Sequence, residues 1–207
     1  MGGQTLGVDA STDNIKIASL HASRDPKLVG GQLEYRDISA EQLLEDGGMT
    51  GRFDVVCSME VVEHVDNPAS FLRSLADLTK VISITLCVRK LKHSQPGGHL
   101  FVSTVARTPL SYFLTIFVAE NVLRMVAPGT HTHSKFINPS EMLEFFHKDL
   151  KWISQLYDGL PTSSEADIRD LAYLPWKSEW LLLPRGTPSQ LQCNYILWAR
   201  KPLVSIS

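Results

Sequence analysis

Short apolar runs alternate with longer amphipathic stretches along the first half of the chain. The apolar runs predict β-strands, and they cover residues 5–8, 33–36, 53–58 and 99–105. The stretches between them predict helices over residues 11–22, over residues 40–45 and from Pro68 onward, each introduced by a polar or proline residue. Strands that alternate with helices at this spacing favour βαβ units, so the predicted fold class is α/β with a mostly parallel sheet.

The second half of the chain has a different pattern. The apolar segment 110–126 is interrupted by Glu120 and Arg124, and it is too short and too charged to span a bilayer. We interpret it as a buried helix over the site or as an interfacial helix at a membrane. A helix over 140–146 with Ser140 as its N-cap is expected next. The remaining predicted strands cover residues 151–157 and 192–199.

Two tryptophans lie in a region rich in proline and tryptophan between these closing strands. They are Trp176 and Trp180. Aromatic side chains of this size dominate protein cores, so we interpret both as core residues. The alternative is that they form part of an apolar cover over the substrate.

Composition restricts the classes of protein that remain. The 207 residues are 43% hydrophobic and 20% charged with a net charge of −2, which is typical of one globular domain and excludes a general nucleic-acid binder. Cys57, Cys87 and Cys193 are far apart and odd in number, so neither a disulfide framework nor a zinc knuckle is predicted. The first residues lack the basic region and apolar core of a secretory signal.

The candidate chemistry lies in one acidic segment, Glu60-Val61-Val62-Glu63-His64, which directly follows the apolar run 53–58. The carboxyl ends of parallel strands form the edge where open α/β sheets bind ligands. If a helix begins there, Glu60, Glu63 and His64 share one face. Two carboxylates and an imidazole favour either a divalent-metal site or an acid–base cluster in which His64 is the general base without a metal.

Three motifs in this order resemble class I S-adenosylmethionine-dependent methyltransferases. They are Gly7-Val8-Asp9, the run from Phe53 through Glu60 to Val65, and Pro96-Gly97-Gly98 before a strand. The resemblance is more specific to the family of ubiquinone biosynthesis O-methyltransferases. The motifs that carry it are Ser103-Thr104, Arg107-Thr108, Ser111-Tyr112 and Pro128-Gly129-Thr130-His131. It implies a Rossmann-like sheet with flanking helices and methylation of catechol-type polyprenylated intermediates.

The resemblance also implies residues that contact S-adenosylmethionine. Asp9, at the end of an early strand, would accept hydrogen bonds from the ribose hydroxyls. Asp37 and Ile38 would flank the adenine, and Ser58 and Met59 would lie beside the methionine part of the cofactor. Turn or strand-end roles without a ligand remain the alternatives for these residues.

The same resemblance implies a magnesium or manganese site. Its ligands would be Glu60, Glu63, His64 and His131, with His133 as a competitor for the last position. A catechol would chelate the metal through its two adjacent oxygens, and the metal would lower the hydroxyl pKa and generate the phenolate nucleophile. His64 and Glu60 would be the catalytic residues. In-line positioning of the methyl group would supply much of the remaining rate.

The chain departs from the family in two places. First, the family's first strand and its glycine-rich loop, of the kind Asp-x-Gly-x-Gly-x-Gly, are missing, since the chain begins at about the following strand. We therefore expect an amino-truncated form whose sheet has exposed edges and whose cofactor binding is weakened. Second, fifteen residues, 81–95, separate Lys80 from Pro96. Their in-frame length and their ends, Val and Gln, match a retained intron; a surface insertion is the alternative.

The resulting prediction is a single methyltransferase domain over residues 1–207. It would comprise a cofactor-binding core (5–105, with the insertion at 81–95), substrate- or membrane-facing helices (106–147), and closing strands with a lid (150–200). It would transfer a methyl group to polyprenylated ubiquinone precursors, namely 3-demethylubiquinol and polyprenyl-dihydroxybenzoate. The resemblance implies a peripheral enzyme on the matrix side of the mitochondrial inner membrane, with a ubiquinone-synthesis complex as partner. The alternatives are a catalytically impaired homologue that only binds partners, and a methyltransferase for another small-molecule hydroxyl.

Overall fold

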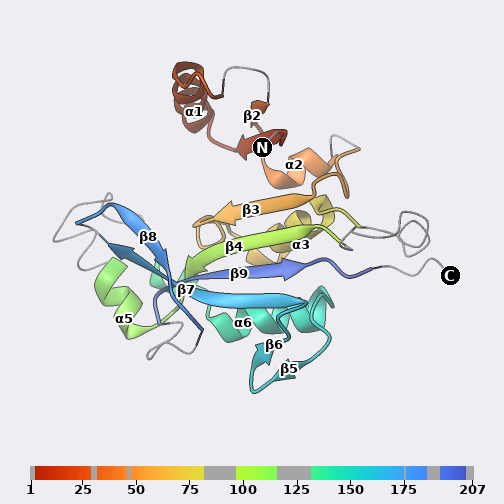
Figure 1. Ribbon diagram of the computed structural model, residues 1–207, viewed down its shortest axis with the longest axis vertical. Coiled ribbons are helices and arrows are strands. Elements are labelled where there is room, and N and C mark those ends of the chain that lie inside the picture. Colours follow the sequence, from red (N-terminus) through yellow and green to blue (C-terminus); the bar gives the residue numbers. More distant parts are fainter. Residues whose placement is uncertain are drawn as a thin grey trace. The chain divides into compact units, whose positions relative to one another are not determined.

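The computed structural model describes residues 3–28, 32–45, 48–81, 97–115, 132–174, 176–185 and 192–203. These residues divide into two compact units, Met1–Thr50 and Gly51–Ser207 (Figure 1). The predicted division into a core, an insertion, helices and closing strands concerns function and stays a prediction.

The first unit is a βαβ element followed by a short helix. Strands β1 (Thr5–Asp9) and β2 (Leu33–Asp37) pair in parallel, and helix α1 (Thr12–Arg24) connects them. Ser11 caps α1, because its hydroxyl accepts a hydrogen bond from the Asn14 amide at 3.4 Å. Helix α2 (Ala40–Glu45) has the predicted bounds. The alternating pattern of the sequence thus predicted every element of this unit.

The second unit contains a five-stranded mixed sheet in the order β3-β4-β9-β7-β8. Only β3 and β4 run in parallel, and the other neighbours are antiparallel. The strands are β3 (Val55–Met59), β4 (His99–Val105), β7 (Ala166–Leu174), β8 (Glu179–Leu182) and β9 (Asn194–Arg200). A separate hairpin joins β5 (Leu156–Tyr157) to β6 (Leu160–Pro161).

Two helices lie behind this sheet in the view of Figure 1, and the core forms between them and the strands. Helix α3 (Pro68–Leu78) has Asn67 as its N-cap and Pro68 in its first turn, where a missing N–H costs nothing. Helix α6 (Pro139–Glu144) continues into a π-helical turn, η3 (Phe145–Asp149). The largest fully buried side chains between these layers are Leu100, Val102, Phe136, Met142, Phe146, Ile153, Tyr195 and Leu197.

Two predictions for the second half of the chain were wrong, and two strands there were not predicted. Helix α6 begins one residue earlier than predicted and its N-cap is Asn138, because Pro139 suits the first helical position better than Ser140. Residues 151–155 form no strand: Lys151 has a φ of 57°, and Trp152 and Ile153 are buried beside Phe146. The strands β7 and β8 were not predicted: only the first four residues of β7 alternate apolar with polar side chains, and β8 lies in the tryptophan-rich region.

The apolar segment 110–126 and the insertion lie mostly outside the described residues. Of the first, the structure describes α5 (Pro109–Ser111) and the residues up to 115; of the second, Val81. A short 3-10 helix, η2 (His133–Lys135), follows. In the described part of the chain, no helix combines the length and apolar character needed to cross a bilayer.

The strands β1 and β3 each have one hydrogen-bonded neighbour. Within the described residues, β1 pairs with β2 alone and β3 pairs with β4 alone.

Candidate functional site

The segment Glu60–His64 forms a turn, so the prediction that its polar residues share one helix face was wrong. Glu60 has a φ of 54°, which a helix does not allow, and α3 begins only at Pro68. The backbone N–H of Glu60 donates to the Ser103 carbonyl at 3.1 Å, and that of His64 donates to the Val61 carbonyl at 2.9 Å. The turn therefore holds the acidic segment against the carboxyl end of β4.

Glu60 follows β3, and its carboxylate is hydrogen-bonded to residues of β4 and β9. Its Oε1 accepts a hydrogen bond from the Ser103 hydroxyl at 2.7 Å, and its Oε2 accepts one from the Asn194 amide at 2.9 Å. A non-glycine residue in the left-handed region costs roughly 1–3 kcal/mol and persists only where its surroundings hold it. These hydrogen bonds from β4 and β9 supply that hold, so the Glu60 side chain has a fixed position.

Glu63 and His64 are neighbours with opposite environments, since the side chain of Glu63 is buried and that of His64 is exposed. Glu63 is 3% exposed, and its Oε2 accepts a hydrogen bond from the Thr104 hydroxyl at 2.8 Å. Its other oxygen lies 4.0 Å from His64 Nε2, and the His64 side chain is 42% exposed. An accessible imidazole with a carboxylate behind it can take a proton from a substrate hydroxyl, because the carboxylate stabilises the imidazolium that forms.

The predicted metal site is not supported by the described residues. Among them, no three His, Cys, Asp or Glu side chains lie where they could hold one metal ion. Both oxygens of Glu60 already accept hydrogen bonds from protein donors. His131 lies outside the described residues, and its competitor His133 contacts the Thr108 carbonyl through Nε2 at 3.1 Å. The metal therefore stays a prediction.

The predicted ribose- and adenine-binding residues lie together at one edge of the first unit. Asp9 and Asp37 are paired across β1 and β2, and the Ile38 amide donates to the Asp9 carbonyl at 3.1 Å. Asp9 accepts hydrogen bonds from the Ser11 amide at 2.7 Å and from the Asn14 side chain at 3.0 Å. Asp37 is exposed and Asp9 is partly exposed, so each carboxylate can accept a further hydrogen bond from a ligand hydroxyl.

Ser58 and Met59 lie in the second unit, directly before Glu60. Ser58 is 4% exposed, and its hydroxyl has no hydrogen-bond partner in the part of the chain that the structure describes. Met59 is 50% exposed. A buried hydroxyl without a partner is costly in a folded protein, so Ser58 has capacity for a ligand contact.

Two further titratable groups lie near the carboxylates. Burial raises the pKa of Tyr195 well above its ordinary value, and the carboxylates Glu141, Glu63 and Glu60 act in the same direction. Its hydroxyl donates to the Ile137 carbonyl at 2.9 Å. Burial also raises the pKa of the Cys193 thiol. Both groups are therefore neutral near pH 7, and Cys193 is not an activated nucleophile.

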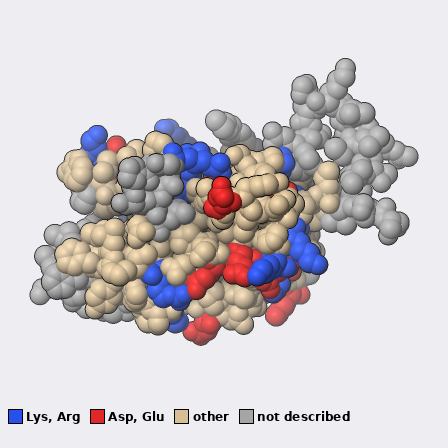
Figure 2. Space-filling view, turned by 90° about the horizontal axis from the view of Figure 1, so that it is seen from below, with Lys and Arg blue, Asp and Glu red and all other residues tan. Residues whose placement is uncertain are grey.

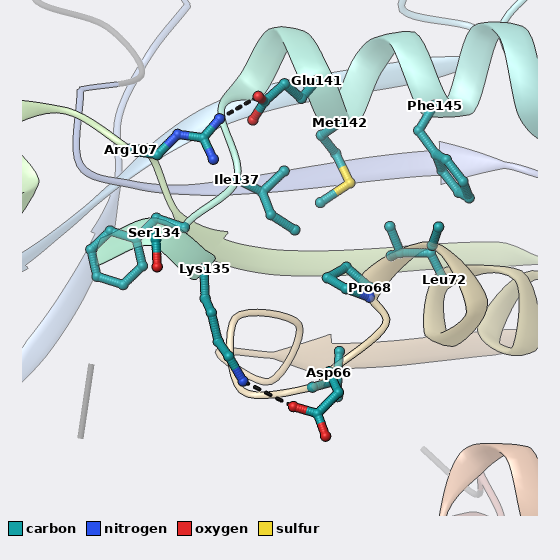
Figure 3. Close-up of a pocket in the computed structure, with 13 residues that line it drawn as sticks. Asp66, Pro68, Leu72, Arg107, Ser134, Lys135, Ile137, Glu141, Met142 and Phe145 are labelled. Atoms are coloured by element: carbon teal, nitrogen blue, oxygen red, sulfur yellow. Dashed lines mark hydrogen bonds and ion pairs between the residues drawn. The ribbon is translucent and has the colours of Figure 1, made fainter. Parts of the chain in front are cut away.

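A pocket of about 400 Å³ adjoins the turn that carries His64 (Figure 3). Its apolar lining comes from α3 and the loop before it, and from α6 with the residues on either side of it: Val65, Pro68, Ala69, Leu72, Phe136, Ile137, Met142 and Phe145. Two ion pairs flank it, Lys135 with Asp66 at 3.1 Å and Arg107 with Glu141. Because each cation has a carboxylate partner, the pocket favours an uncharged apolar group.

Sequence reasoning did not assign a role to the residues that hold the two glutamates. Ser103 and Thr104 were noted only as a motif, and Asn194 gave no signal at all. The Asn194 contact depends on the antiparallel pairing of β9 with β4, which places it opposite Val105. No local pattern in the sequence could have predicted that register.

Comparison with known proteins identifies the relatives of the chain. A methyltransferase domain model matches residues 1–86. The mitochondrial ubiquinone biosynthesis O-methyltransferase of Schizosaccharomyces pombe is 40% identical over 204 residues, which cover 98% of this chain and 63% of the relative. The mitochondrial enzyme of the same name from Arabidopsis thaliana is 35% identical over 97% of this chain and 51% of its own length. The chain thus spans about half to two thirds of the length of these curated relatives.

Solved structures agree on the fold. An S-adenosylmethionine-dependent methyltransferase from Thermotoga maritima superimposes with a TM-score of 0.54 at 14% identity, covering 96% of this chain and 73% of that one. At this identity the likeness shows the fold alone. Domain, fold and homologues agree, and the chain belongs to the class I S-adenosylmethionine-dependent methyltransferases, with ubiquinone biosynthesis O-methyltransferases as its curated homologues.

Proposed function

We propose that the protein transfers a methyl group from S-adenosylmethionine to a catechol-type hydroxyl of a polyprenylated ubiquinone precursor, such as 3-demethylubiquinol or polyprenyl-dihydroxybenzoate. The observation that carries the proposal is the 40% identity to a ubiquinone biosynthesis O-methyltransferase over nearly the whole chain. The exposed His64 beside buried Glu63 supplies a base for the hydroxyl.

The residues of the first unit suit the nucleoside part of the cofactor. Asp9 and Asp37 end neighbouring parallel strands, where acidic side chains bind ribose hydroxyls in related folds. Ser58 has a buried hydroxyl with no partner among the described residues and would contact the methionine part. S-adenosylmethionine supplies a methyl group that is electrophilic because it is bonded to a sulfonium.

The residues of the second unit suit the acceptor. His64 Nε2 would take the proton of the catechol hydroxyl while the new oxygen–carbon bond forms and the carbon–sulfur bond breaks. Glu63 would stabilise the imidazolium, and Glu60, fixed by Ser103 and Asn194, would position the ring. Holding both reactants in line converts the transfer into an effectively unimolecular step.

No step of this mechanism passes through a metal. Glu60, Glu63, His64 and His131 have the donor chemistry of a magnesium or manganese site, but the described members do not converge on one point. If a metal assists, a chelator will abolish activity and magnesium will restore it. If His64 acts alone, activity will survive the chelator.

The pocket supports an acceptor with an apolar part, and a pair of variants tests this. Ala69 lines the pocket on the exposed first turn of α3, whereas the exposed neighbour Ser70 does not line it. Ala69→Phe should raise KM for a prenylated catechol about tenfold and leave KM for a tail-less catechol unchanged. Ser70→Phe, which adds the same ring beside the pocket, should change neither value. Equal effects of the two variants on the prenylated acceptor would argue against a role for the pocket.

The decisive experiment has two parts. Calorimetric titration of S-adenosylhomocysteine into the purified chain should give micromolar binding, and a methylation assay with a tail-less catechol should show turnover. His64→Ala should lower kcat by at least about 100-fold and leave S-adenosylhomocysteine binding unchanged. The exposed His21 provides a matched control, since His21→Ala should behave like the wild type.

A second candidate is a catalytically impaired homologue that only binds partners. The single pairing partners of β1 and β3 among the described residues favour it, because a strand with an open edge holds a ligand less rigidly. A folded circular dichroism spectrum with no S-adenosylhomocysteine binding would support this candidate and contradict the first.

The names of the same relatives support a mitochondrial location. Both eukaryotic relatives described above are named mitochondrial, so we propose a mitochondrial protein that lies on the matrix side of the inner membrane and contacts a ubiquinone-synthesis complex. Fractionation of mitochondria should recover it with inner membranes and release it with alkaline carbonate. Recovery in the cytosol would contradict the proposal.

A further inference from the structure

The hairpin of β7 and β8 exposes large apolar side chains on both of its faces. All four residues of β8 are exposed, among them Trp180 at 53%, Leu181 at 46% and Leu182 at 53%. Trp176, in the turn before β8, is 77% exposed. Successive side chains of a strand point to opposite faces, so Trp180 and Leu182 lie on one face and Leu181 on the other. The interpretation of Trp176 and Trp180 as core residues was therefore wrong.

The hairpin projects beyond the edge of the sheet that carries the site. The pairing of β7 with β9 ends at Leu171 opposite Asn194, and β7 continues to Leu174 paired with β8 alone. Asn194 is also opposite Val105 at the carboxyl end of β4. The hairpin thus extends past the ends of β4 and β3, where Glu60 and His64 follow.

A second group of exposed apolar residues lies at the same edge. Helix α5 follows the end of β4, and its cap Thr108 donates a hydrogen bond to the carbonyl of Gln192, two residues before β9. The exposed residues here are Leu110, Tyr112, Phe113 and Leu114, each at least 41% exposed. Figure 1 shows α5 and β8 at the same end of this unit. Both groups can therefore meet one surface.

Charge contributes little to this end of the unit. Lys177 in the hairpin turn and Glu179 at the start of β8 carry opposite charges, and Arg185 pairs with Asp167 at 2.5 Å. In Figure 2, the described surface on the side where α5 and β8 lie is mainly neither acidic nor basic. A strongly basic or acidic partner would find no complementary patch here.

We propose that the β7–β8 hairpin lies in the interfacial region of a lipid bilayer and, with the start of α5, turns the site toward the membrane. A flat protein partner would cover one face of β8, whereas lipid can surround both. Tryptophan prefers the membrane interface, because its ring is apolar and its N–H stays hydrogen-bonded. The inference rests on the proposed function, since a polyprenylated acceptor resides in the bilayer.

Tryptophan fluorescence provides a direct test. The chain has four tryptophans, and the other two are Trp152, which is 5% exposed, and Trp198, whose N–H donates to His99. Addition of neutral phosphatidylcholine vesicles should shift the emission to shorter wavelength, and brominated lipid should quench it. The double variant Trp176→Ser/Trp180→Ser should lose both responses and reduce vesicle co-sedimentation at least tenfold. Because apolar contact dominates, 0.5 M salt should weaken co-sedimentation less than twofold.

The control is Tyr157→Ser, which removes an aromatic ring that is 59% exposed on the β5–β6 hairpin. It should bind vesicles like the wild type. Vesicle binding by the double variant equal to that of the wild type would overturn the inference. It would also be overturned if the wild type bound no vesicles and the double variant instead lost a dimer that the wild type forms. Turnover of a tail-less catechol separates the two proposals: if turnover is absent but hairpin-dependent vesicle binding persists, the proposed function fails and the membrane contact stands.

Discussion

At the scale of single residues, Glu60 is the position where backbone and chemistry are most closely linked. Its φ of 54° lies in the region that glycine prefers, yet the chain has a glutamate whose two oxygens are held by Ser103 and Asn194. A left-handed residue beside a site is consistent with a functional constraint, because a glycine would supply the turn without strain.

A pair of variants separates this strain from the hydrogen bonds. Glu60→Gly and Glu60→Ala both remove the carboxylate, but only glycine relaxes at a positive φ. We expect Glu60→Ala to be less stable than Glu60→Gly by about 1 kcal/mol, the reverse of the usual order in ordered structure. Urea unfolding followed by circular dichroism measures the difference. A more stable alanine variant would show that Glu60 is not held in the left-handed region.

Because of Tyr195, we expect the free energy of unfolding to decrease as the pH rises into the alkaline range. Its pKa in the folded state is raised above the ordinary value of 10.0, chiefly by burial. The unfolded chain therefore loses this proton first, so the contribution of Tyr195 to stability is complete below pH 10 and decreases as the pH rises above it. Tyr195→Phe should lose about 1 kcal/mol at pH 7, because the Ile137 carbonyl loses its donor. Its stability should fall less steeply than that of the wild type between pH 9 and about 11, as measured by urea unfolding at each pH.

At the scale of elements, local signals predicted the first unit well and the closing half poorly. The start of α6 shows the reason. Asn138 precedes a proline, and its side-chain oxygen accepts a hydrogen bond from the backbone amide of Arg107 at 3.0 Å. The backbone amide of Asn138 donates to the Glu141 carboxylate at 2.8 Å. The Ser140 hydroxyl is a local N-cap signal, but the contact with Arg107 is a tertiary one.

Two alanine variants distinguish these N-caps. Asn138→Ala should destabilise the protein by about 1–2 kcal/mol, since it removes the acceptor for Arg107 at the start of the helix. Ser140→Ala should change stability by less than about 0.5 kcal/mol, as expected of a surface position. The unfolding temperatures of the two variants, compared with that of the wild type, show which residue is the N-cap. A larger loss at Ser140 would restore the N-cap that the sequence alone predicted.

At the scale of the whole molecule, the described residues on either side of the insertion lie next to each other. The Gly98 amide donates to the Lys80 carbonyl at 2.9 Å, and Gly97 has a φ of 79°. If residues 81–95 are removed, Lys80-Pro96-Gly97-Gly98 has the hydrogen bond, the proline and the positive φ of a type II β-turn. A Cβ at Gly97 would lie 1.9 Å from the Lys201 carbonyl, so this position requires glycine.

Deletion of residues 81–95 should therefore preserve the fold. We expect the deletion variant to unfold at the same temperature as the full chain or a few degrees above it, because Lys80 and Gly98 are already hydrogen-bonded and a shorter connection costs less entropy to close. Transcript sequencing should find splice junctions at both ends of the segment if it is a retained intron. A destabilised deletion variant, together with uninterrupted genomic coding sequence, would identify it as a genuine structural insertion.

The sequence by itself determined the βαβ pattern, the strands that lead to the site, the family and the positions of its acidic residues, because these depend on local periodicity and on short motifs. Tertiary structure alone decided that Glu60 is held from β9, that Glu63 is buried while His64 is exposed, and that Trp176 and Trp180 face outward. These outcomes depend on strand register and on which side chains a sheet covers. Both are set by contacts between residues far apart in the chain, which no local pattern specifies.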